Sequence, residues 1–257
     1  MMADSKMHRF SRTELLIGAE GVAALSRARV AVIGLGGAGS YAVEALARAG
    51  VGWLVLADPR MVDISDTNRQ LTAAGDAYGK PKVDVLAERV KAINPEAVVV
   101  TWQEWAGPWN LEAILHGKVQ WMLDTCGLPL QRAERIGFAA GRGIPVMAIL
   151  DTGGRTDPLS FRKSDIGSIR DCQEAEALRV ALYQRGIKTG VSAVYSTEPP
   201  VRQTTVAESG CHGSACQKRS SCRGCSGCRQ PDGSLSYLAP MAGLIAAGEL
   251  IRTLQTV

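Results

Sequence analysis

The sequence predicts an α/β fold in which helices cover both faces of a mostly parallel sheet. Three observations carry this prediction: short β-branched runs alternate with helical stretches, those stretches are amphipathic, and a glycine-rich turn joins the first run to the first helix. A strand, a crossover helix and a second parallel strand form a right-handed unit, and repeating that unit builds such a sheet. The chain of 257 residues is long enough for one sizeable core.

Each expected strand is a short apolar run, and each expected helix repeats apolar residues every three or four positions. The expected strands are RVAVIG (29–34), WLVLAD (53–58), AVVVTW (97–102), VQWMLD (119–124), PVMAIL (145–150) and VSAVYS (191–196). The expected helices are 38–49, 82–92, 109–116, 130–142, 174–185 and a last one from about Pro240 to Leu254. Residues 151–165 are expected to form a loop.

A glycine motif follows the first expected strand. Gly34, Gly36 and Gly39 form the pattern Gly-x-Gly-x-x-Gly, with Gly37 between them. The first glycine permits a tight turn, the second lets the backbone approach a phosphate, and the third permits close packing of helix on strand. Asp58 ends the next strand, about twenty residues further on, where a carboxylate accepts hydrogen bonds from ribose hydroxyls. These features indicate a Rossmann-like, doubly wound fold with a nucleotide site.

Two cations follow Asp58 in the stretches DTNRQ (66–70) and YGKPKVD (78–84). Arg69 and Lys82 are expected on the carboxyl side of the sheet, where the phosphates lie. Fixed cations stabilise the charge that develops on phosphoryl oxygens, whereas hydride transfer does not need them. The sequence therefore favours a reaction at a phosphate, with an NAD-dependent dehydrogenase as an alternative that tight NADH binding would support.

The composition is that of an ordinary globular protein. The formal net charge of +4 suits an anionic partner such as ATP or tRNA, although a scattered charged surface would give the same value. The N-terminal stretch contains no apolar run of signal-peptide length, and the apolar C-terminal stretch contains Glu249. We therefore expect a soluble cytoplasmic protein without a membrane partner, whose cysteines are thiols or metal ligands.

Five of the seven cysteines lie in CHGSACQKRSSCRGCSGC (211–228). Short, paired spacings let thiolates converge on one ion, and this loop has too few large apolar residues to order itself by burial. We expect structural zinc, with an iron–sulfur cluster as the first alternative and a loop of reduced thiols as another. The predicted metal ligands are Cys211, Cys216, Cys222, Cys225 and Cys228.

Several motifs together resemble one known family. FSRTELLIGAEGVAAL, VIGLGGAGSYAVEALARAGVG, NRQL, GKPKV and INPE occur in this order. The chain resembles the ThiF/MoeB/HesA superfamily of adenylating enzymes, and within it the TcdA/CsdL branch of tRNA threonylcarbamoyladenosine dehydratases. The similarity is strong from about Phe10 to Pro95 and continues through DTGGRTDP, YSTEPP and SLSYLAPMAGLIAAGELI. It implies a single ThiF-type nucleotide-binding domain over 1–257, with a Cys-rich, metal-binding insertion at 199–234 and a C-terminal extension.

The resemblance also implies a chemistry. Such enzymes use ATP and Mg²⁺ to activate a carboxylate as an acyl-adenylate; in this branch the substrate is modified tRNA, and a neighbouring group closes a ring as AMP leaves. Family motifs assign the phosphates to Gly34 through Gly39, the ribose to Asp58, the nucleotide to Asn68, and the triphosphate to Arg69 and Lys82. Two further assignments follow: Arg12 reaches a neighbouring subunit's site in a homodimer, and Asp124 lies at the mouth of the site. Gly243 and Gly248 in the last helix would also allow close packing in a dimer.

Two positions depart from the family pattern. Gly127 stands where a carboxylate usually serves the magnesium ion, and Asp66 replaces an asparagine near the phosphates. We expect an active enzyme in which Asp66 and Asp124 arrange the metal differently. One alternative is a catalytically impaired nucleotide- and metal-binding scaffold. Another is adenylation of a sulfur-carrier or ubiquitin-like protein, with Cys126 as a thioester-forming residue, although a packing role for Cys126 is the simpler interpretation.

Overall fold

A seven-stranded sheet organises residues 7–201 and 233–256, the part of the chain that the computed structural model describes. The strand order is β3-β2-β1-β4-β5-β7-β6, and every neighbouring pair is parallel except β6 with β7. The strands are β1 (Arg29–Ile33), β2 (Trp53–Ala57), β3 (Val98–Trp102), β4 (Trp121–Asp124), β5 (Val146–Ile149), β6 (Phe161–Asp165) and β7 (Ser192–Ser196). The predicted doubly wound α/β fold is therefore confirmed.

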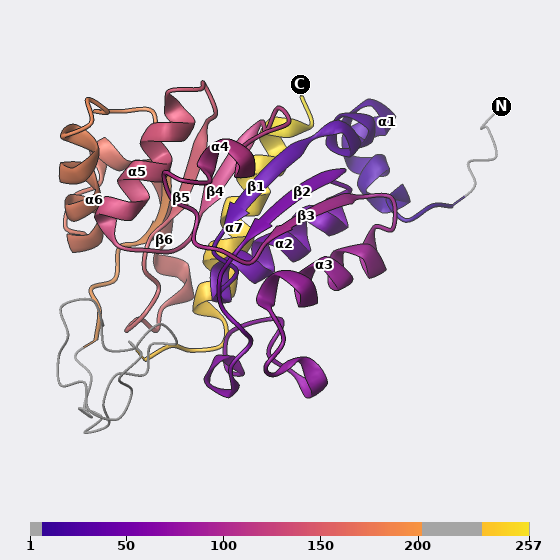
Figure 1. The fold of residues 1–257 in the computed structure, drawn as a ribbon, viewed down its shortest axis with the longest axis horizontal. Helices are drawn as coiled ribbons and strands as arrows, with labels where there is room; N and C mark the ends of the chain where they lie inside the picture. Colours follow the sequence, from indigo (N-terminus) through magenta and orange to yellow (C-terminus); the bar gives the residue numbers. More distant parts are fainter. Residues whose placement is uncertain (1–6, 202–232, 257) are drawn as a thin grey trace.

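Helices cover both faces of this sheet (Figure 1). The α-helices are α1 (Ser11–Arg27), α2 (Gly37–Ala49), α3 (Lys82–Ile93), α4 (Leu111–Ile114), α5 (Pro129–Ala140), α6 (Gln173–Tyr183) and α7 (Leu238–Leu254). Short 3-10 turns are η1 (Ile64–Asp66), η2 (Gly75–Ala77), η3 (Pro158–Ser160) and η4 (Ile166–Ser168). Helices α1, α2, α3 and α7 pack on one face, and α4, α5 and α6 on the other. None of the helices in the described ranges has both the length and the apolar character needed to cross a membrane.

The alternation of side chains along each strand divides the core into two layers. In β1, Val30 and Val32 join the cluster beneath α2 and α7, whereas Ala31 and Ile33 join the cluster beneath α5. Successive side chains of a strand point to opposite faces, so an uninterrupted apolar strand must be covered on both. This is the physical basis of the layered fold that the apolar runs predict.

Two segments differ from the sequence-based expectation. The pattern predicts a loop over 151–165, but Phe161–Asp165 form β6, which pairs antiparallel with β7. As an edge strand, β6 buries Phe161 and exposes Arg162 and Lys163, so it lacks the apolar run that marks the central strands. Residues 11–27, for which no element was expected, form α1, which is interrupted at Gly18.

The small residues of α7 pack within the chain. A Cβ atom at Gly243 would lie 2.1 Å from the Ala38 carbonyl oxygen of α2, so only glycine permits this approach of the two helices. A Cβ atom at Gly248 would meet nothing within 4 Å. The inference of a dimer from these two glycines is therefore wrong for Gly243, because a contact inside the chain explains it.

Candidate functional site

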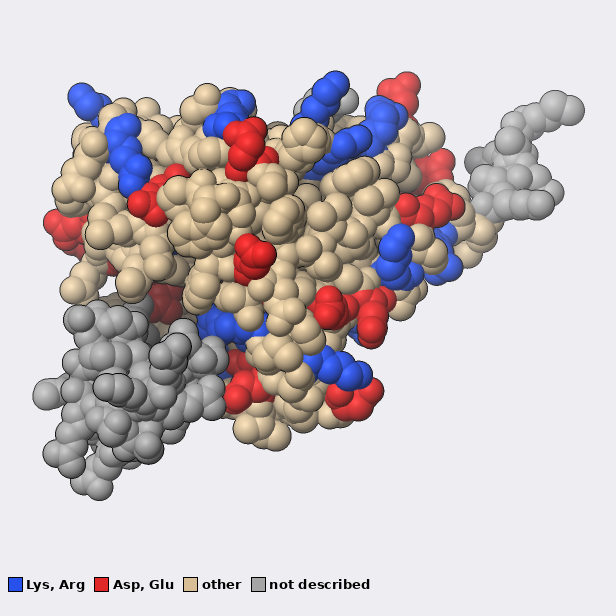
Figure 2. Space-filling view, in the orientation of Figure 1, with Lys and Arg blue, Asp and Glu red and all other residues tan. Residues whose placement is uncertain are grey.

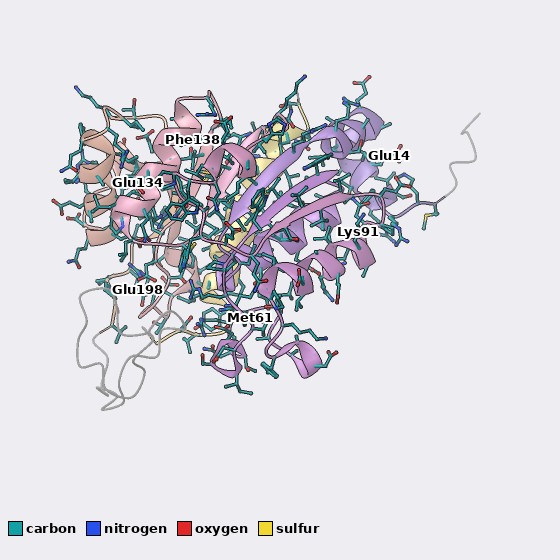
Figure 3. The ribbon with its side chains drawn as sticks, in the orientation of Figure 1. Glu14, Met61, Lys91, Glu134, Phe138 and Glu198 are labelled. Atoms are coloured by element: carbon teal, nitrogen blue, oxygen red, sulfur yellow. The ribbon has the colours of Figure 1, made fainter. Side chains whose placement is uncertain are left out.

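The candidate site lies where the sheet changes direction. Strand β1 pairs with β2 on one side and with β4 on the other, so successive crossovers leave in opposite directions. A crevice outside the carboxyl ends of the strands at such a switch point is the usual ligand site of open α/β sheets. The segment that joins β2 to α3 extends beyond this edge (Figure 1), and Met61 near its start is labelled in Figure 3.

The glycine turn opens the N-terminus of α2 toward this crevice. Gly34 follows β1 with φ +93°, and a Cβ atom at Gly39 would lie only 1.9 Å from the Gly34 carbonyl oxygen. Helix α2 begins after Gly36, has no side-chain cap and has no acidic residue in its first turn. Uncapped backbone N–H groups and the positive end of the helix dipole favour an anion here. This geometry fits the phosphate role predicted for Gly34, Gly36, Gly37 and Gly39.

Asp58 joins the glycine turn to the end of β2. Its Oδ2 accepts a hydrogen bond from the Leu35 backbone N–H at 2.8 Å, and its Oδ1 accepts one from the Arg60 N–H at 2.9 Å. The side chain is buried, and it holds the turn in register with the end of β2. Each carboxylate oxygen can accept more than one hydrogen bond, so these contacts are compatible with the ribose role that the sequence predicts.

Asp66 lies between the two cations predicted to hold the triphosphate. Its Oδ2 is 2.8 Å from Lys82 Nζ, and its Oδ1 is 3.2 Å from Arg69 Nη2. Gln70 Nε2 donates a further hydrogen bond to Oδ1 at 2.6 Å. Lys82 is only 2% exposed, and Asp66 6%. The structure thus brings Arg69 and Lys82 together, as predicted, but around a carboxylate of the protein.

Two other predicted residues lie at different distances from this cluster. Asn68 is next to Arg69, and its Nδ2 donates to the Ser234 carbonyl oxygen at 2.8 Å. Arg12 is exposed on α1, close to Phe10, whose ring would contact a Cβ atom at Gly50. Gly50 ends α2 at the edge of the sheet opposite the crevice, so Arg12 is far from the site of its own chain.

Asp124 occupies a different environment from the predicted one. It ends β4, but its side chain is fully buried and does not lie open at the mouth of the site. Oδ2 accepts from Arg132 Nε at 2.6 Å, and Oδ1 accepts from Arg135 Nε at 2.8 Å. Arg132 also pairs with Glu174 at 2.7 Å and donates to the Ile149 carbonyl oxygen at 2.9 Å. Asp124 therefore ties β4 and β5 to α5 and α6, and the expectation of an open position is corrected.

Sequence reasoning missed Arg132 and Arg135. They are one turn apart on α5, the helix that follows β4, so both side chains reach back over the strand end. Two arginines with that spacing, directly after a strand that ends in aspartate, were the available signal. Burial alone would lower the pKa of Arg132, but the carboxylates of Asp124 and Glu174 raise it above its ordinary value.

Gly127 has a backbone conformation that disfavours the carboxylate of the family pattern. Its φ is +103°, and a Cβ atom there would lie 3.0 Å from Arg135 Nη2. We predict that Gly127→Asp does not increase AMP formation from ATP and lowers the free energy of unfolding by about 1–3 kcal/mol, because an L-residue is strained at this φ. Urea denaturation and product analysis measure both effects.

The matched control for this variant is Gly143→Asp. Gly143 also has a positive φ, +69°, but a Cβ atom there would meet nothing within 4 Å. This control places an aspartate at a second glycine of positive φ, away from Arg135. A gain in AMP formation that is confined to Gly127→Asp would contradict the prediction and would restore the metal-binding interpretation of this position.

Cys126 packs against the glycine turn. A Cβ atom at Gly34 would lie 2.6 Å from its sulfur, and burial raises the pKa of the Cys126 thiol to about 11. A thiol with that pKa is protonated at neutral pH and is a poor nucleophile. The arrangement supports the packing role over thioester formation.

We therefore predict that Cys126→Ala retains ATP-dependent AMP formation. We also predict that Cys126 of the native protein reacts slowly with iodoacetamide near neutral pH. Peptide mass spectrometry checks the labelling, and Cys172→Ala, which removes the other cysteine of the described ranges, is the control. Loss of activity in Cys126→Ala alone, with a trapped thioester in the native protein, would overturn this role.

A cavity of about 230 Å³ lies between the β3–α4 connection and α5. Trp105 and Trp109 line it together with Gln131, Glu134 and Arg135; Glu134 is labelled on α5 in Figure 3. The Arg60 guanidinium lies over the Trp105 ring, 5.9 Å from its centroid, and the Arg60 N–H binds Asp58. Arg60 therefore links the Trp105 wall of the cavity to Asp58, and the cavity offers aromatic surfaces of the kind that stack on a planar base.

The carboxylates expected to hold magnesium are both engaged by cations of the protein. Asp124 pairs with two arginines, and Asp66 pairs with Lys82 and Arg69. Across the described ranges, no group of three or more His, Cys, Asp or Glu side chains could hold a metal ion. The five cysteines predicted to bind zinc, Cys211 to Cys228, lie outside those ranges.

The charge of the molecule is dispersed on the face shown in Figure 2. Lys and Arg side chains are interspersed there with Asp and Glu over most of the visible described surface, and several Lys and Arg side chains lie next to one another along its upper edge. The visible described surface therefore does not by itself mark a binding site for an anionic partner.

Comparison with known proteins gives consistent results. Residues 10–257 match the ThiF family. The chain is 33% identical over 250 residues to the tRNA threonylcarbamoyladenosine dehydratase of Bacillus subtilis, covering 96% of this chain and 95% of that protein. The crystal structure of the Escherichia coli dehydratase TcdA in complex with ATP superposes with a TM-score of 0.82 at 26% identity, covering 100% of this chain and 97% of the other. The complex of TcdA with AMP gives a TM-score of 0.83 at the same identity and coverage.

Proposed function

The chain belongs to the ThiF family, and we propose that it is an ATP-dependent dehydratase that cyclises threonylcarbamoyladenosine in tRNA through an acyl-adenylate. One observation carries this proposal: the switch point of the sheet has both a glycine turn that leads into the uncapped N-terminus of α2 and the two cations Lys82 and Arg69. Similarity to the Bacillus subtilis dehydratase over nearly the whole chain supports the choice of substrate.

The proposed reaction begins with attack of the substrate carboxylate oxygen on the α-phosphorus of ATP. The bond between the α-phosphorus and the oxygen that bridges it to the β-phosphorus breaks, and pyrophosphate leaves. Amide N–H groups of the glycine turn and the cations Lys82 and Arg69 stabilise the negative charge that builds on the phosphoryl oxygens. A neighbouring group of the same modification then attacks the acyl carbon. AMP leaves with the former carboxylate oxygen, so the net change in the substrate is loss of water.

We propose that the base of the nucleotide enters the cavity beside Trp105, because Arg60 lies over the Trp105 ring and its backbone N–H donates to Asp58, to which the ribose is assigned. Magnesium would supply charge compensation at the phosphates. The oxygens of Asp66 and Asp124 are engaged by cations of the protein, so neither side chain is assigned to this ion. We also propose a homodimer in which the exposed Arg12 reaches the partner's site. A tRNA substrate would place the enzyme in the cytoplasm.

The experiment that tests the function is incubation of the purified chain with ATP and threonylcarbamoylated tRNA. AMP and pyrophosphate should form only with the modified tRNA, and mass spectrometry of nucleosides should show the product lighter by one water. Unmodified tRNA is the control. Folded protein that binds ATP but forms neither product would refute the proposal, and a carrier-protein adenylate formed with a sulfur carrier would establish the alternative reaction.

We further propose that four of the five cysteines Cys211, Cys216, Cys222, Cys225 and Cys228 bind structural zinc, because their short spacings suit tetrahedral thiolate ligation. The predicted result is about one zinc per chain by elemental analysis. A chelator should lower the melting temperature, because a structural site contributes its binding free energy to folding. Replacing Cys225 with serine should have the same effect, and Cys172→Ser is the control. Iron with labile sulfide would establish a cluster, and metal-free protein of unchanged stability would contradict any metal site.

A further inference from the structure

Asp66 gives the phosphate site an internal negative charge. Its carboxylate pairs with Lys82 at 2.8 Å and with Arg69 at 3.2 Å, the two cations assigned to the triphosphate. Both cations contact the Asp66 carboxylate, so the charges of the three side chains add at the phosphate site. Two cations and one carboxylate give this cluster a net charge of about +1 instead of +2.

The fold holds this carboxylate in place. Asp66 ends the short turn η1, where its Oδ2 accepts the Asp63 backbone N–H at 3.2 Å in a capping box. Gln70 Nε2 donates to Oδ1 at 2.6 Å. Gln70 is itself buried, and its Oε1 has no hydrogen-bond partner among the described residues. Because the backbone, an amide and two cations all hold the carboxylate, it remains in the site when a nucleotide arrives.

The consequence depends on the charge of the nucleotide. Free ATP carries about two more negative charges than its complex with a divalent cation, which binds through the phosphates. An additional fixed carboxylate repels the more highly charged form more strongly, and partial burial weakens the screening of that repulsion. The effect requires no coordination of the cation by Asp66.

We propose that Asp66 is a specificity-determining residue that makes this site select the divalent-cation complex of ATP over free ATP. This inference rests on the proposed use of ATP. It assigns a role to one of the two positions at which the resemblance predicts a departure from the family pattern, and it is consistent with a carboxylate that is already paired with cations of the protein. The nucleotide then brings its own compensating cation.

The test is calorimetric titration of the full chain with ATP, in excess Mg²⁺ and in EDTA. The native protein should bind the magnesium complex at least about tenfold more tightly than free ATP. Asp66→Asn should bind free ATP more tightly and reduce that ratio by about tenfold, since the amide keeps the shape of the side chain without its charge. An unchanged ratio in Asp66→Asn would overturn the proposal.

The matched control is Asp76→Asn. Asp76 also pairs with a lysine, Lys80 at 2.9 Å, in the same connection between β2 and α3, but this pair is exposed. Removing that carboxylate changes the net charge equally and should leave the ratio unaltered. A similar fall in both variants would show a general charge effect and would contradict the assignment to Asp66.

A measurement on the native protein covers the case in which Asp66→Asn does not fold. If selection depends on charge, Ca²⁺ should restore tight ATP binding as Mg²⁺ does. A strict requirement for Mg²⁺, or equal binding of free and complexed ATP, would refute the proposal. These titrations contain no tRNA, so a chain that selects complexed ATP but forms no AMP with modified tRNA would refute the proposed function alone.

Discussion

Replacing Lys82 with methionine should lower the rate of AMP formation by about 10²–10³-fold, the usual effect of removing one preorganised charge from a reacting phosphate or oxyanion. The same change should lower the free energy of unfolding by about 3–5 kcal/mol. It removes the buried cation that lies 2.8 Å from Asp66 and leaves only the partly exposed Arg69 to compensate this carboxylate, and losing one partner of a buried ion pair is costly. Single-turnover kinetics with modified tRNA and urea denaturation measure the two effects.

The two effects of Lys82→Met can be separated. The double variant Asp66→Asn/Lys82→Met removes both charges of the pair, so it should recover much of the stability and little of the activity. Lys80→Met, which removes an exposed lysine two positions away, is the matched control and should resemble the native protein. If the double variant recovered activity along with stability, Lys82 would have a structural role only.

Asp124→Ala should be as destabilising as the loss of Lys82. Arg132 and Arg135 are each nearly fully buried, and both lose the carboxylate that compensates them. Breaking a buried ion pair by removing one partner typically costs about 3–5 kcal/mol. The expected result is a clearly lower urea concentration at the midpoint of unfolding. The m-value, which reports the surface exposed on unfolding, should stay the same.

The control for Asp124→Ala is Glu112→Ala. Glu112 pairs with Arg142 on the surface, where both side chains are exposed, and exposed pairs contribute little to stability. An equal midpoint for Asp124→Ala and the native protein would show that this network does not stabilise the fold. ATP binding by the folded fraction of Asp124→Ala distinguishes loss of structure from loss of a nucleotide contact.

Buried ion pairs adjoin the two positions, Gly127 and Asp66, at which the resemblance predicts a departure from the family pattern. Gly127 has no side chain, and Arg135 occupies the adjacent space, donating to the Cys126 carbonyl oxygen and to Asp124. On the other side of the crevice, Asp66 compensates Lys82. Each departure is therefore accompanied by a charge pair that the fold supports.

The sequence by itself determined the layered α/β fold, the glycine turn and the position of Asp58. These follow from short-range patterns. Apolar runs predict strands, and apolar residues repeated every three or four positions predict helices. The glycine spacing predicts a tight turn in which Gly39 lies against the Gly34 carbonyl. The edge strand β6 was not predictable in this way, because it buries only Phe161 from a polar run.

Only the tertiary structure decided which charges meet. Residue spacing placed Arg69, Lys82 and Asp124 at the carboxyl edge of the sheet, but the pairing of Asp66 with Lys82, and of Asp124 with Arg132 and Arg135, depends on how separate elements pack. The same holds for Gly243, whose contact is with α2. Local periodicity fixes which face a side chain takes, whereas electrostatic compensation depends on distances between atoms that the sequence does not specify.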